Sequence, residues 1–466
     1  MNHPHTTWVL SLSLLCLVSS SALGQTIEGW RTDGSGQYPN ANPPTKWSKT
    51  ENVVWATELP ASNSLPVLVE DRIFVCAEPT TVFCLDANKG TILWRKDQGY
   101  QQVVSPNEWA KVQVEIAKVE NLQQLANKAR REARSLTRKF QDKLPENIQA
   151  QIAELEKQQA KIKATIEKMP LAAKWAMPRT HRGLNGYSTP TPVTDGKHLW
   201  TLFGNGVAAC YTLEGKRVWI KVIDRPQANF GLSSSPLRIG NTLVVTINKM
   251  LGLDPKTGKL LWESNSKQTW GSPTSITVNG TRQILSPRGE IVDPNNGKIV
   301  AKGRRLNTRH STPVVGENSI LFMDQISNAV SIPREDETNL PLVWSQRLPQ
   351  GRYFSSPIVY DGLVYTINEA QILSVLDTKS GKIVNQKQMG ENRRTRFFSS
   401  LARAGKYIYL TNSQGTTHVI RGGKKYVEVA RNELDEPVRS SPVFRGNTMY
   451  LRTTKHLYCI REKNVK

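Results

Sequence analysis

The chain is poor in cysteine and lacks the short motifs that mark common catalytic and metal sites. It has five cysteines in 466 residues, none of them adjacent or spaced as Cys-x-x-Cys. It also contains no His-Glu-x-x-His pair, no Gly-x-Ser-x-Gly turn and no glycine-rich phosphate-binding loop. These absences argue against a zinc site, a serine hydrolase of the common type and a nucleotide-binding enzyme.

Acidic residues are also in short supply. The sequence has 39 Asp and Glu against 62 Lys and Arg, a formal net charge of +23. Two interpretations stay open: the charge maintains solubility, or it attracts an anionic partner such as phospholipid headgroups or acidic glycans. Nucleic acid is not expected as a partner, because no nucleic-acid-binding motif is present and the chain carries an export signal, described next.

The N-terminus has the pattern of a secretory signal peptide. An apolar stretch, Val9 to Val18, precedes Ser-Ala-Leu-Gly, which puts Ala22 and Gly24 at the small-residue cleavage positions. We expect residues 1–24 to be removed and the protein to be periplasmic or extracellular, with peripheral membrane contact as an option. A signal anchor and a lipid on Cys16 are the alternatives.

A short phrase, Ser-Ser/Thr-Pro followed by an apolar run, recurs through the rest of the chain. The eight copies, two of them weaker, are Ser64-Leu65-Pro66, Ser188-Thr189-Pro190, Ser234-Ser235-Pro236, Gly271-Ser272-Pro273, Ser311-Thr312-Pro313, Ser355-Ser356-Pro357, Ser399-Ser400-Leu401 and Ser440-Ser441-Pro442. Six of the seven intervals run from 37 to 46 residues. A period in this range is typical of propeller blades or solenoid units.

The content of one unit decides between these two architectures. After Pro236 come the apolar runs Leu243–Ile247 and Met250–Leu253, then the turn Asp254–Gly258, and finally a strand that ends at Trp262. These runs and the phrase itself predict a four-stranded antiparallel sheet. Eight such units predict an eight-bladed β-propeller.

The end of each unit carries a family resemblance. Residues 85–94 read Leu-Asp-Ala-Asn-Lys-Gly-Thr-Ile-Leu-Trp, and residues 376–384 repeat the pattern. They resemble the PQQ-like, quinoprotein-type β-propeller repeat, which ends in Leu-Asp-x-x-Thr-Gly-x-x-x-Trp, and the match spans residues 52–460. The leader from Gly29 to Ser48 resembles that of secreted bacterial PQQ-like propellers, although Arg31-Thr32-Asp33-Gly34 departs from their usual Arg-Gly-Pro. The chain as a whole is similar to members outside the dehydrogenases, such as the propeller of the outer-membrane assembly machinery.

The two chain ends predict how the ring closes. The last unit stops before any strand that ends in Trp, whereas Asn52-Val53-Val54-Trp55 has that ending without a preceding phrase. We expect this N-terminal strand to complete the C-terminal blade, which removes the open sheet edge.

One interval is too long for a blade. Pro66 and Pro190 are 124 residues apart, and the apolar positions between them step by three and four. The stripes are Val112, Ile116, Val119, Leu122, Ala126, Ala129, Ala133, Leu136 and Phe140, then Ile148, Ile152, Leu155, Gln159, Ile162, Ile166 and Met169. They predict an antiparallel, coiled-coil-like hairpin of two long helices. Either it reaches out to a partner or to a second copy of the chain, or it lies across the propeller as a lid.

The predicted organisation is then complete. It comprises the signal peptide (1–24), an N-terminal tether (25–51), the closure strand and first blade (52–100), the helical insertion (101–180) and the remaining blades (181–466).

The cysteines fit the repeat. Cys84, Cys210 and Cys459 occupy the position two before the Asp-turn, where the family usually has alanine, so we interpret them as small buried fillers. Cys76 and Cys84 flank an expected hairpin, which leaves a disulfide as an alternative in an oxidising compartment.

A basic and aromatic group precedes the phrases. Arg309, Arg352, Arg396 and Arg439 lie just before four consecutive copies, in loops expected to meet at the mouth of the central channel. Aromatic residues of the same loops are Trp270, His310, Tyr353, Phe354 and Phe397. The candidate ligand-binding residues are Arg309, His310, Arg352, Tyr353, Arg396, Arg439 and Trp270, for an anionic or sugar-like ligand. A solvated rim is the alternative.

The resemblance also implies which residues a dehydrogenase of this family would need. Those family members hold PQQ against a disulfide of adjacent cysteines, with a calcium ion on acidic and amide side chains and an aspartate as base. This chain has no adjacent cysteines, and its carboxylates lie chiefly in the Asp-turns. We therefore expect no catalytic residue, metal or cofactor, PQQ and calcium included. The predicted function is a binding scaffold of the cell envelope, and the alternative is a quinoprotein-like oxidoreductase or ligand sensor.

Overall fold

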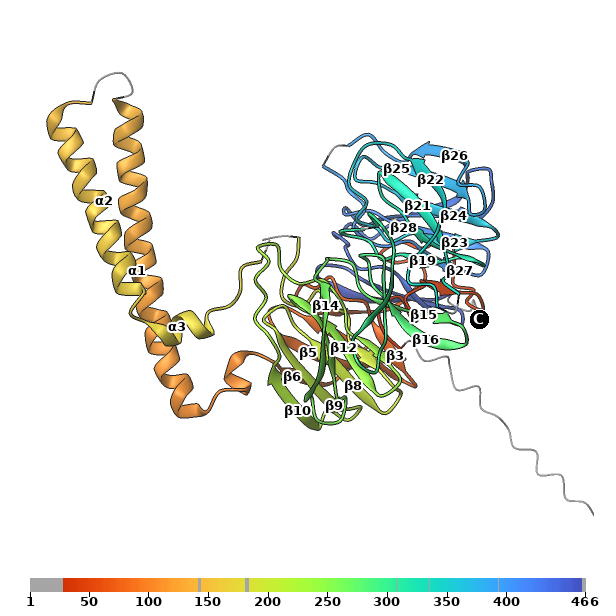
Figure 1. Ribbon diagram of the computed structural model, residues 1–466, viewed down its shortest axis with the longest axis horizontal. Coiled ribbons are helices and arrows are strands. Elements are labelled where there is room, and N and C mark those ends of the chain that lie inside the picture. Colours follow the sequence, from red (N-terminus) through yellow and green to blue (C-terminus); the bar gives the residue numbers. More distant parts are fainter. Residues whose placement is uncertain are drawn as a thin grey trace, which may run out of the picture.

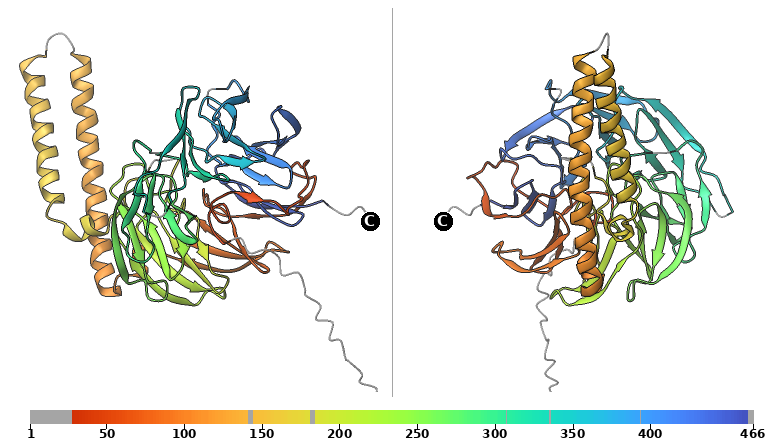
Figure 2. Two further views of the ribbon diagram at one scale, coloured as in Figure 1. Left: turned by 45° about the vertical axis from the view of Figure 1, so that its right-hand side comes forward. Right: turned by 90° about the vertical axis from the view of Figure 1, so that its left-hand side faces the viewer.

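Eight sheets surround a common axis and form a β-propeller (Figure 2). The computed structural model describes residues 28–140, 144–180, 184–306, 308–334, 336–392 and 394–462. The expected signal peptide and the start of the tether lie outside the described residues. The eight blades confirm the predicted fold class.

Each of blades 1 to 7 uses four consecutive strands, from the channel outward. Blades 1 to 4 consist of β3 to β6 (Val67–Val69, Arg72–Ala77, Thr81–Asp86, Ile92–Asp97), β7 to β10 (Val193–Thr194, His198–Leu202, Val207–Thr212, Arg217–Val222), β11 to β14 (Leu237–Ile239, Thr242–Thr246, Lys249–Leu253, Leu260–Lys267) and β15 to β18 (Thr274–Val278, Thr281–Leu285, Glu290–Val292, Ile299–Lys302). Blades 5 to 7 consist of β19 to β22 (Val314–Val315, Ser319–Phe322, Ile326–Ser331, Leu342–Arg347), β23 to β26 (Ile358–Tyr360, Leu363–Ile367, Ile372–Asp377, Ile383–Gln388) and β27 to β30 (Ala402–Ala404, Tyr407–Thr411, Thr416–Arg421, Val427–Glu433).

Blade 8 combines the two ends of the chain. Its inner strands β31 to β33 (Val443–Arg445, Thr448–Arg452, His456–Ile460) come from the C-terminus, and β2 (Val53–Glu58) is its outer strand. The register joins Val53 to Ile460 and Glu58 to His456. This pairing confirms the predicted closure by the N-terminal strand.

Burial follows the position of a strand within its blade. All five residues of β12 are buried, because both of its faces pack against neighbouring blades. The outer strand β14 instead alternates between exposed and buried side chains, as expected for a strand with one face in water.

Tryptophans in the outer strands join five of the blades to the next one. Their indole N–H groups donate to carbonyl oxygens in the Asp-turn of the following blade. The five pairs are Trp55 with Ala87, Trp94 with Leu213, Trp219 with Pro255, Trp262 with Pro294 and Trp344 with Thr378, at 2.9 to 3.2 Å. The turn glycine packs beneath the indole: at Gly90 φ is +72°, and a Cβ would lie 2.6 Å from the Trp55 ring. The repeated Gly and Trp therefore act as one docking unit.

Three cysteines complete these docking units. Cys84, Cys210 and Cys459 lie directly across the strand pair from Trp94, Trp219 and Trp55. A small side chain at this position leaves room for the indole, and Ala329 and Gly252 serve opposite the other two docking tryptophans. The cysteines are therefore buried fillers, as predicted.

The alternative of a disulfide between Cys76 and Cys84 is wrong. In the β4–β5 hairpin Cys76 is paired with Val82, and Cys84 is paired with Phe74. The two cysteines are two positions out of register, and all four described cysteines are free thiols. Facing positions are needed for the short Cβ separation of a disulfide.

The recurring phrase forms a ring of hydrogen bonds around the channel, here called the hydroxyl belt. The backbone N–H of one phrase donates to the hydroxyl of the phrase in the next blade at 2.8 to 3.0 Å. The hydroxyls are those of Thr191, Ser235, Ser272, Thr312, Ser356, Ser400 and Ser441. Leu65 offers no hydroxyl, so the belt has no eighth link between blades 8 and 1.

The belt corrects the expected alignment of blade 2. Its hydroxyl belongs to Thr191, so Pro192 rather than Pro190 is the equivalent proline. The sequence Ser-Thr-Pro-Thr-Pro offers both registers, and only the hydrogen bond to Ser235 distinguishes them.

The insertion is a helical hairpin that stands beside the disc (Figure 1). It consists of α1 (Pro106–Lys139) and α2 (Glu146–Ile166), followed by the short α3 (Pro170–Trp175). Ser105 caps α1 by accepting from the backbone N–H of Glu108. Every position of the two predicted apolar stripes is buried or half-buried, as expected when the stripes face each other. None of the helices in the described part of the chain has the length and apolar composition needed to cross a membrane.

The base of the hairpin is tied to blades 1 and 2. Tyr100 packs edge-on against Trp175, with ring centroids 5.3 Å apart, and donates to the carbonyl of Asn205 at 2.7 Å. Arg225, in the loop after blade 2, donates to the carbonyls of Lys174 and Ala176. A face-on view of the disc shows the hairpin running in front of it from this base (Figure 2, right).

The N-terminal segment crosses one end of the central channel. The carbonyl of Glu28 accepts from Thr194 in blade 2, and the buried Arg31 donates to the carbonyls of Pro357 and Leu401 in blades 6 and 7. The segment then adds β1 (Gln37–Tyr38) in parallel to β27 of blade 7. One end of the channel is thereby closed.

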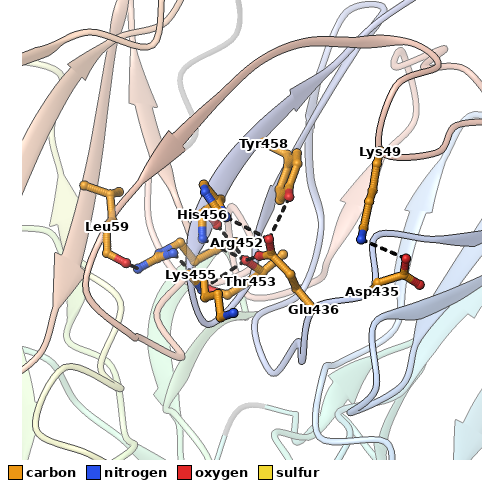
Figure 3. Close-up of polar contacts among 9 residues, drawn as sticks. All are labelled: Lys49, Leu59, Asp435, Glu436, Arg452, Thr453, Lys455, His456 and Tyr458. Atoms are coloured by element: carbon orange, nitrogen blue, oxygen red, sulfur yellow. Dashed lines mark hydrogen bonds and ion pairs between the residues drawn. The ribbon is translucent and has the colours of Figure 1, made fainter.

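A buried polar cluster reinforces the closure of blade 8 (Figure 3). Glu436 lies 2.8 Å from Nδ1 of His456 and accepts from the Tyr458 hydroxyl at 2.9 Å. The fully buried Arg452 donates to the carbonyl of Leu59, at 3.2 Å, in the segment that follows β2. The cluster thus connects the C-terminal strands to the N-terminal part of the chain.

Candidate binding site at the channel mouth

A cavity of about 400 Å³ occupies the open end of the channel. All eight blades contribute to it through the connections that precede their inner strands. Its floor includes belt residues such as Ser356, Ser400 and Ser441, together with Trp30 of the N-terminal segment. The volume falls within the range of about 300–1,000 Å³ usual for ligand pockets.

The cavity is basic. Arg309, Arg352, Arg396 and Arg439 all line it, and no carboxylate is among the described lining residues. Arg396 lies 3.8 Å from Glu369 just outside, so its charge is partly balanced. The structure thus brings together the four arginines that the sequence placed before consecutive phrases.

Arg439 is the most enclosed of these four side chains. Its guanidinium lies 5.9 Å from the centroid of the Phe398 ring, in a cation–π arrangement. Burial lowers the pKa of Arg439 below its ordinary value. Its Nε is buried and has no hydrogen-bond partner among the described residues, so a donor at the cavity wall lacks an acceptor.

Aromatic rings form a continuous row along one side of the cavity. Trp270 and His310 are stacked at 5.3 Å, His310 and Phe354 are 5.0 Å apart, and Phe354 and Phe398 are 5.2 Å apart. At the other end of the row, Phe230 meets Trp270 at 6.0 Å. The row runs through blades 3 to 7, since each ring comes from the loop of a different blade.

His310 sits in this row as a neutral ring at physiological pH. Burial lowers its pKa, and the positive charges of Arg352 and Arg309 lower it further. Glu369 acts in the opposite direction but does not outweigh them. His310 therefore behaves as an aromatic and hydrogen-bonding group rather than as a fifth cation.

Two of the aromatic assignments made from the sequence need correction. Tyr353, a candidate ligand residue, is 2% exposed, packs in the core between blades 5 and 6 and donates its hydroxyl to the carbonyl of Pro349. Phe397 is likewise buried, against blade 6. Their neighbours Phe354 and Phe398 line the cavity instead, because successive residues in extended backbone point to opposite sides.

Phe230 and Phe398 also line the cavity, although no pattern in the sequence singled them out above. A usable signal exists for Phe398: two residues before the last five belt hydroxyls, the chain has Trp270, His310, Phe354, Phe398 and Arg439. Phe230 has no such signal, because it lies five residues before the belt hydroxyl of Ser235 rather than two.

A second cavity lies between the middle of α1 and the disc. Its volume is about 880 Å³, and its walls come from α1, the segment after α3 and the loop after β10. Three arginines, Arg130, Arg179 and Arg225, contribute to it, and again no carboxylate is among the described lining residues.

The lining of the channel mouth does not fit PQQ with calcium. It contains neither a cysteine pair nor a carboxylate to bind the metal. Across the described residues, no group of three or more His, Cys, Asp or Glu side chains is arranged to hold a metal ion. We derive no reaction step through this cofactor.

Fold and repeats together define a class: this chain is a PQQ-like repeat β-propeller. The family model described as outer membrane protein assembly factor BamB matches it twice, over residues 46–251 and 248–464. Because these matches cover most of the chain, the protein belongs to the BamB family.

Individual relatives are distant. BamB of Taylorella asinigenitalis is 24% identical over 216 residues, which cover 44% of this chain and 55% of that protein. The chain therefore matches about half the length of this curated relative.

Two solved structures share the fold. The crystal structure of BamB from Moraxella catarrhalis has a TM-score of 0.54 at 10% identity and covers 89% of this chain and 98% of that one. A europium-containing methanol dehydrogenase has a TM-score of 0.58 at 10% identity, over 94% and 99% of the two chains. At such identities the likeness concerns the fold alone, and it extends to a BamB and a dehydrogenase alike.

Proposed function

We propose that this protein is a non-catalytic, exported scaffold of the bacterial cell envelope, which presents its basic channel mouth and its helical hairpin to partners. Membership of the BamB family supports a role in binding other envelope proteins. The single observation that carries the proposal is the channel mouth itself, with four arginines and no described carboxylate in its lining. Such a lining attracts anionic groups, and it holds no described carboxylate that could act as a general base or bind a metal ion beside His310.

The position of the hairpin supports the same role. It is inserted in the connection from blade 1 to blade 2, the same kind of connection that supplies the arginines of the mouth. Hairpin and mouth therefore share one face of the disc, and the N-terminal segment closes the other end of the channel. A partner that docks on this face meets both features at once, either as an envelope protein or with an anionic glycan or lipid headgroup.

The hairpin can be tested without disturbing its base. Residues 124–161 are replaced by a short glycine-rich turn, which keeps Tyr100, Trp175 and the proximal part of the helices. Affinity capture from envelope extract, after chemical cross-linking, compares this variant with the intact chain. We expect the truncated protein to fold and to lose part of its partner set. Identical partner sets would remove the hairpin from the proposal.

The absence of catalysis is tested separately. The purified protein is titrated with PQQ and calcium while absorbance and melting temperature are followed. We expect neither a saturable change nor dye reduction. Saturable binding accompanied by dye reduction would replace the scaffold by the quinoprotein-like alternative.

A further inference from the structure

The two cavities adjoin each other. The loop after β10 separates them, with Asn229 lining the cavity beneath the hairpin and Phe230 lining the channel mouth. Of the residues that follow the hairpin, Arg179 lines the cavity beneath the hairpin and Asn185 lines the channel mouth. Asn185 donates to the carbonyl of Phe230 at 3.1 Å, so these two residues form one low ridge.

The hairpin turns a basic face toward the disc. Arg130 lines the cavity beneath the hairpin. Arg134 and Arg138 follow it at steps of four residues, which places them on the same side of α1. None of the three forms an ion pair with a described residue, and all three are exposed. Arg309 and Arg352, which line the mouth, are exposed as well.

Like charges on both surfaces oppose direct closure of the hairpin onto the mouth. Two arginine-bearing surfaces repel each other unless an anion lies between them. The arrangement thus disfavours the lid interpretation and favours an extended anionic occupant. Such an occupant would start in the channel mouth and pass over Phe230 toward the hairpin.

The neutral groups of the mouth indicate the chemistry of that occupant. The hydroxyls of Ser356, Ser400 and Ser441 accept backbone N–H groups in the belt, which leaves their own hydrogens to be donated into the cavity. Trp270 adds its ring to the same lining, stacked on His310. Many neutral donors beside an aromatic row suit the hydroxyls and C–H faces of sugar rings, whereas arginines suit carboxylates or sulfates.

We propose that the channel mouth and the cavity beneath the hairpin form one binding track for an acidic oligosaccharide, a chain of sugar units that carry carboxylate or sulfate groups. The mouth holds one end of the chain, Phe230 supports the middle, and Arg130 and Arg179 bind the units beyond the ridge. This inference rests on the proposed function, because it assigns a ligand to the same basic mouth.

The test measures the affinity of the intact chain for oligogalacturonates of two to eight units by titration calorimetry, with neutral cello-oligosaccharides as controls. We expect binding of the acidic sugars alone, an affinity that rises with chain length, and a decline with added salt. Binding that is absent, equal for neutral sugars or independent of length would overturn the proposal.

Two variants separate the parts of the track. Replacing Arg309, Arg352, Arg396 and Arg439 by Gln should weaken binding of all acidic oligomers by about tenfold or more, since charge-assisted hydrogen bonds are lost. The double variant R130Q and R179Q should bind the two-unit oligogalacturonate as the intact chain does. It should no longer bind the longer oligomers more tightly than the short ones. A control removes equal charge from exposed outer positions, as R95Q, R347Q, R421Q and R461Q, and should bind nearly as well as the intact chain. Melting temperatures confirm that each variant is folded.

Other ligand classes are outcomes of the same experiment. Tighter binding of a glutamate-rich peptide, or of vesicles with anionic phospholipid, than of the octamer would overturn the assignment to a sugar. The capture experiment with the truncated hairpin remains an independent test. If the intact chain captured protein partners but bound no acidic sugar, this inference would be refuted and the scaffold function would remain in place.

Discussion

The indole N–H of Trp55 donates to the carbonyl oxygen of Ala87 at 3.2 Å, although the two residues belong to blades 8 and 1. Trp55 lies on β2, the strand that the N-terminal part of the chain contributes to blade 8. Its docking on the Asp-turn of blade 1 closes the ring in the same way that four other tryptophans join neighbouring blades. Blade 8 is thus joined to blade 1 by the same kind of contact that joins neighbouring blades elsewhere in the ring.

The Trp55 contact can be tested from both sides. Trp55→Ala should lower the free energy of unfolding by about 2–4 kcal/mol, as for other large-to-small changes of packed aromatics. Gly90→Ala should also destabilise, because the new methyl group meets the indole at 2.6 Å. The control is Gly196→Ala, which has a similar positive φ of +83° but open space around it. Equal losses at Gly90 and Gly196 in urea unfolding would contradict the docking role.

The hydroxyl belt predicts a difference between alanine and threonine. Ser356→Ala removes the acceptor of the Thr312 N–H, and a buried donor without a partner costs about 1–3 kcal/mol. Ser356→Thr keeps the hydroxyl and should be far milder, since Thr191 and Thr312 already serve in the belt. Urea unfolding of the two variants measures the difference. Similar losses would show that the belt hydroxyl contributes through packing alone.

Acid should weaken the polar cluster of blade 8. Burial raises the pKa of Glu436, but hydrogen bonds from Thr453 and Tyr458 and the charge of His456 outweigh it and hold the pKa below the ordinary 4.5. A lowered folded-state pKa means that the carboxylate stabilises the fold fully above pH 4.5 and loses this effect as the pH falls below it. Glu436→Gln should be less stable at neutral pH and lose less on acidification.

The measurement for this cluster is unfolding free energy between pH 7 and pH 3. The matched control is Glu58→Gln, at an exposed position of β2, which should follow the intact chain. A pH dependence of Glu436→Gln equal to that of the intact chain would exclude Glu436 as the source.

The buried thiols should be inert in the folded protein. Burial raises the pKa of Cys84, Cys210 and Cys459 to about 12, so these groups stay protonated at neutral pH. In the chain without residues 1–24, a thiol-specific probe should label almost nothing natively and four cysteines after unfolding without reductant. Two labelled cysteines instead of four would indicate a disulfide that this structure does not contain.

The periodic features could be predicted from the sequence because they depend on local spacing. The phrase interval defined the blades, the stripe from Val112 to Met169 defined the hairpin, and Trp55 identified the closing strand. In each case a repeated side chain is placed by the geometry of its own strand or helix, and the rest of the molecule only repeats that geometry.

Features that depend on which side of the backbone a residue faces could not be decided in this way. Tyr353 and Phe354 are equally aromatic neighbours, and only the core between blades 5 and 6 determines that Tyr353 turns inward and Phe354 toward the channel. The same reason applies to Cys76, whose strand register places it opposite Val82 rather than Cys84.

The sequence by itself therefore determined the eight blades, the hairpin and the arginines that precede four consecutive phrases. The tertiary structure alone decided that these arginines share one cavity with Phe230 and Phe398, and that this cavity adjoins a second one beneath the hairpin. The physical reason is ring closure. It brings loops that are some 40 residues apart in the sequence to one axis, where their charges act together. The local sequence around each loop does not show which other loops it will meet.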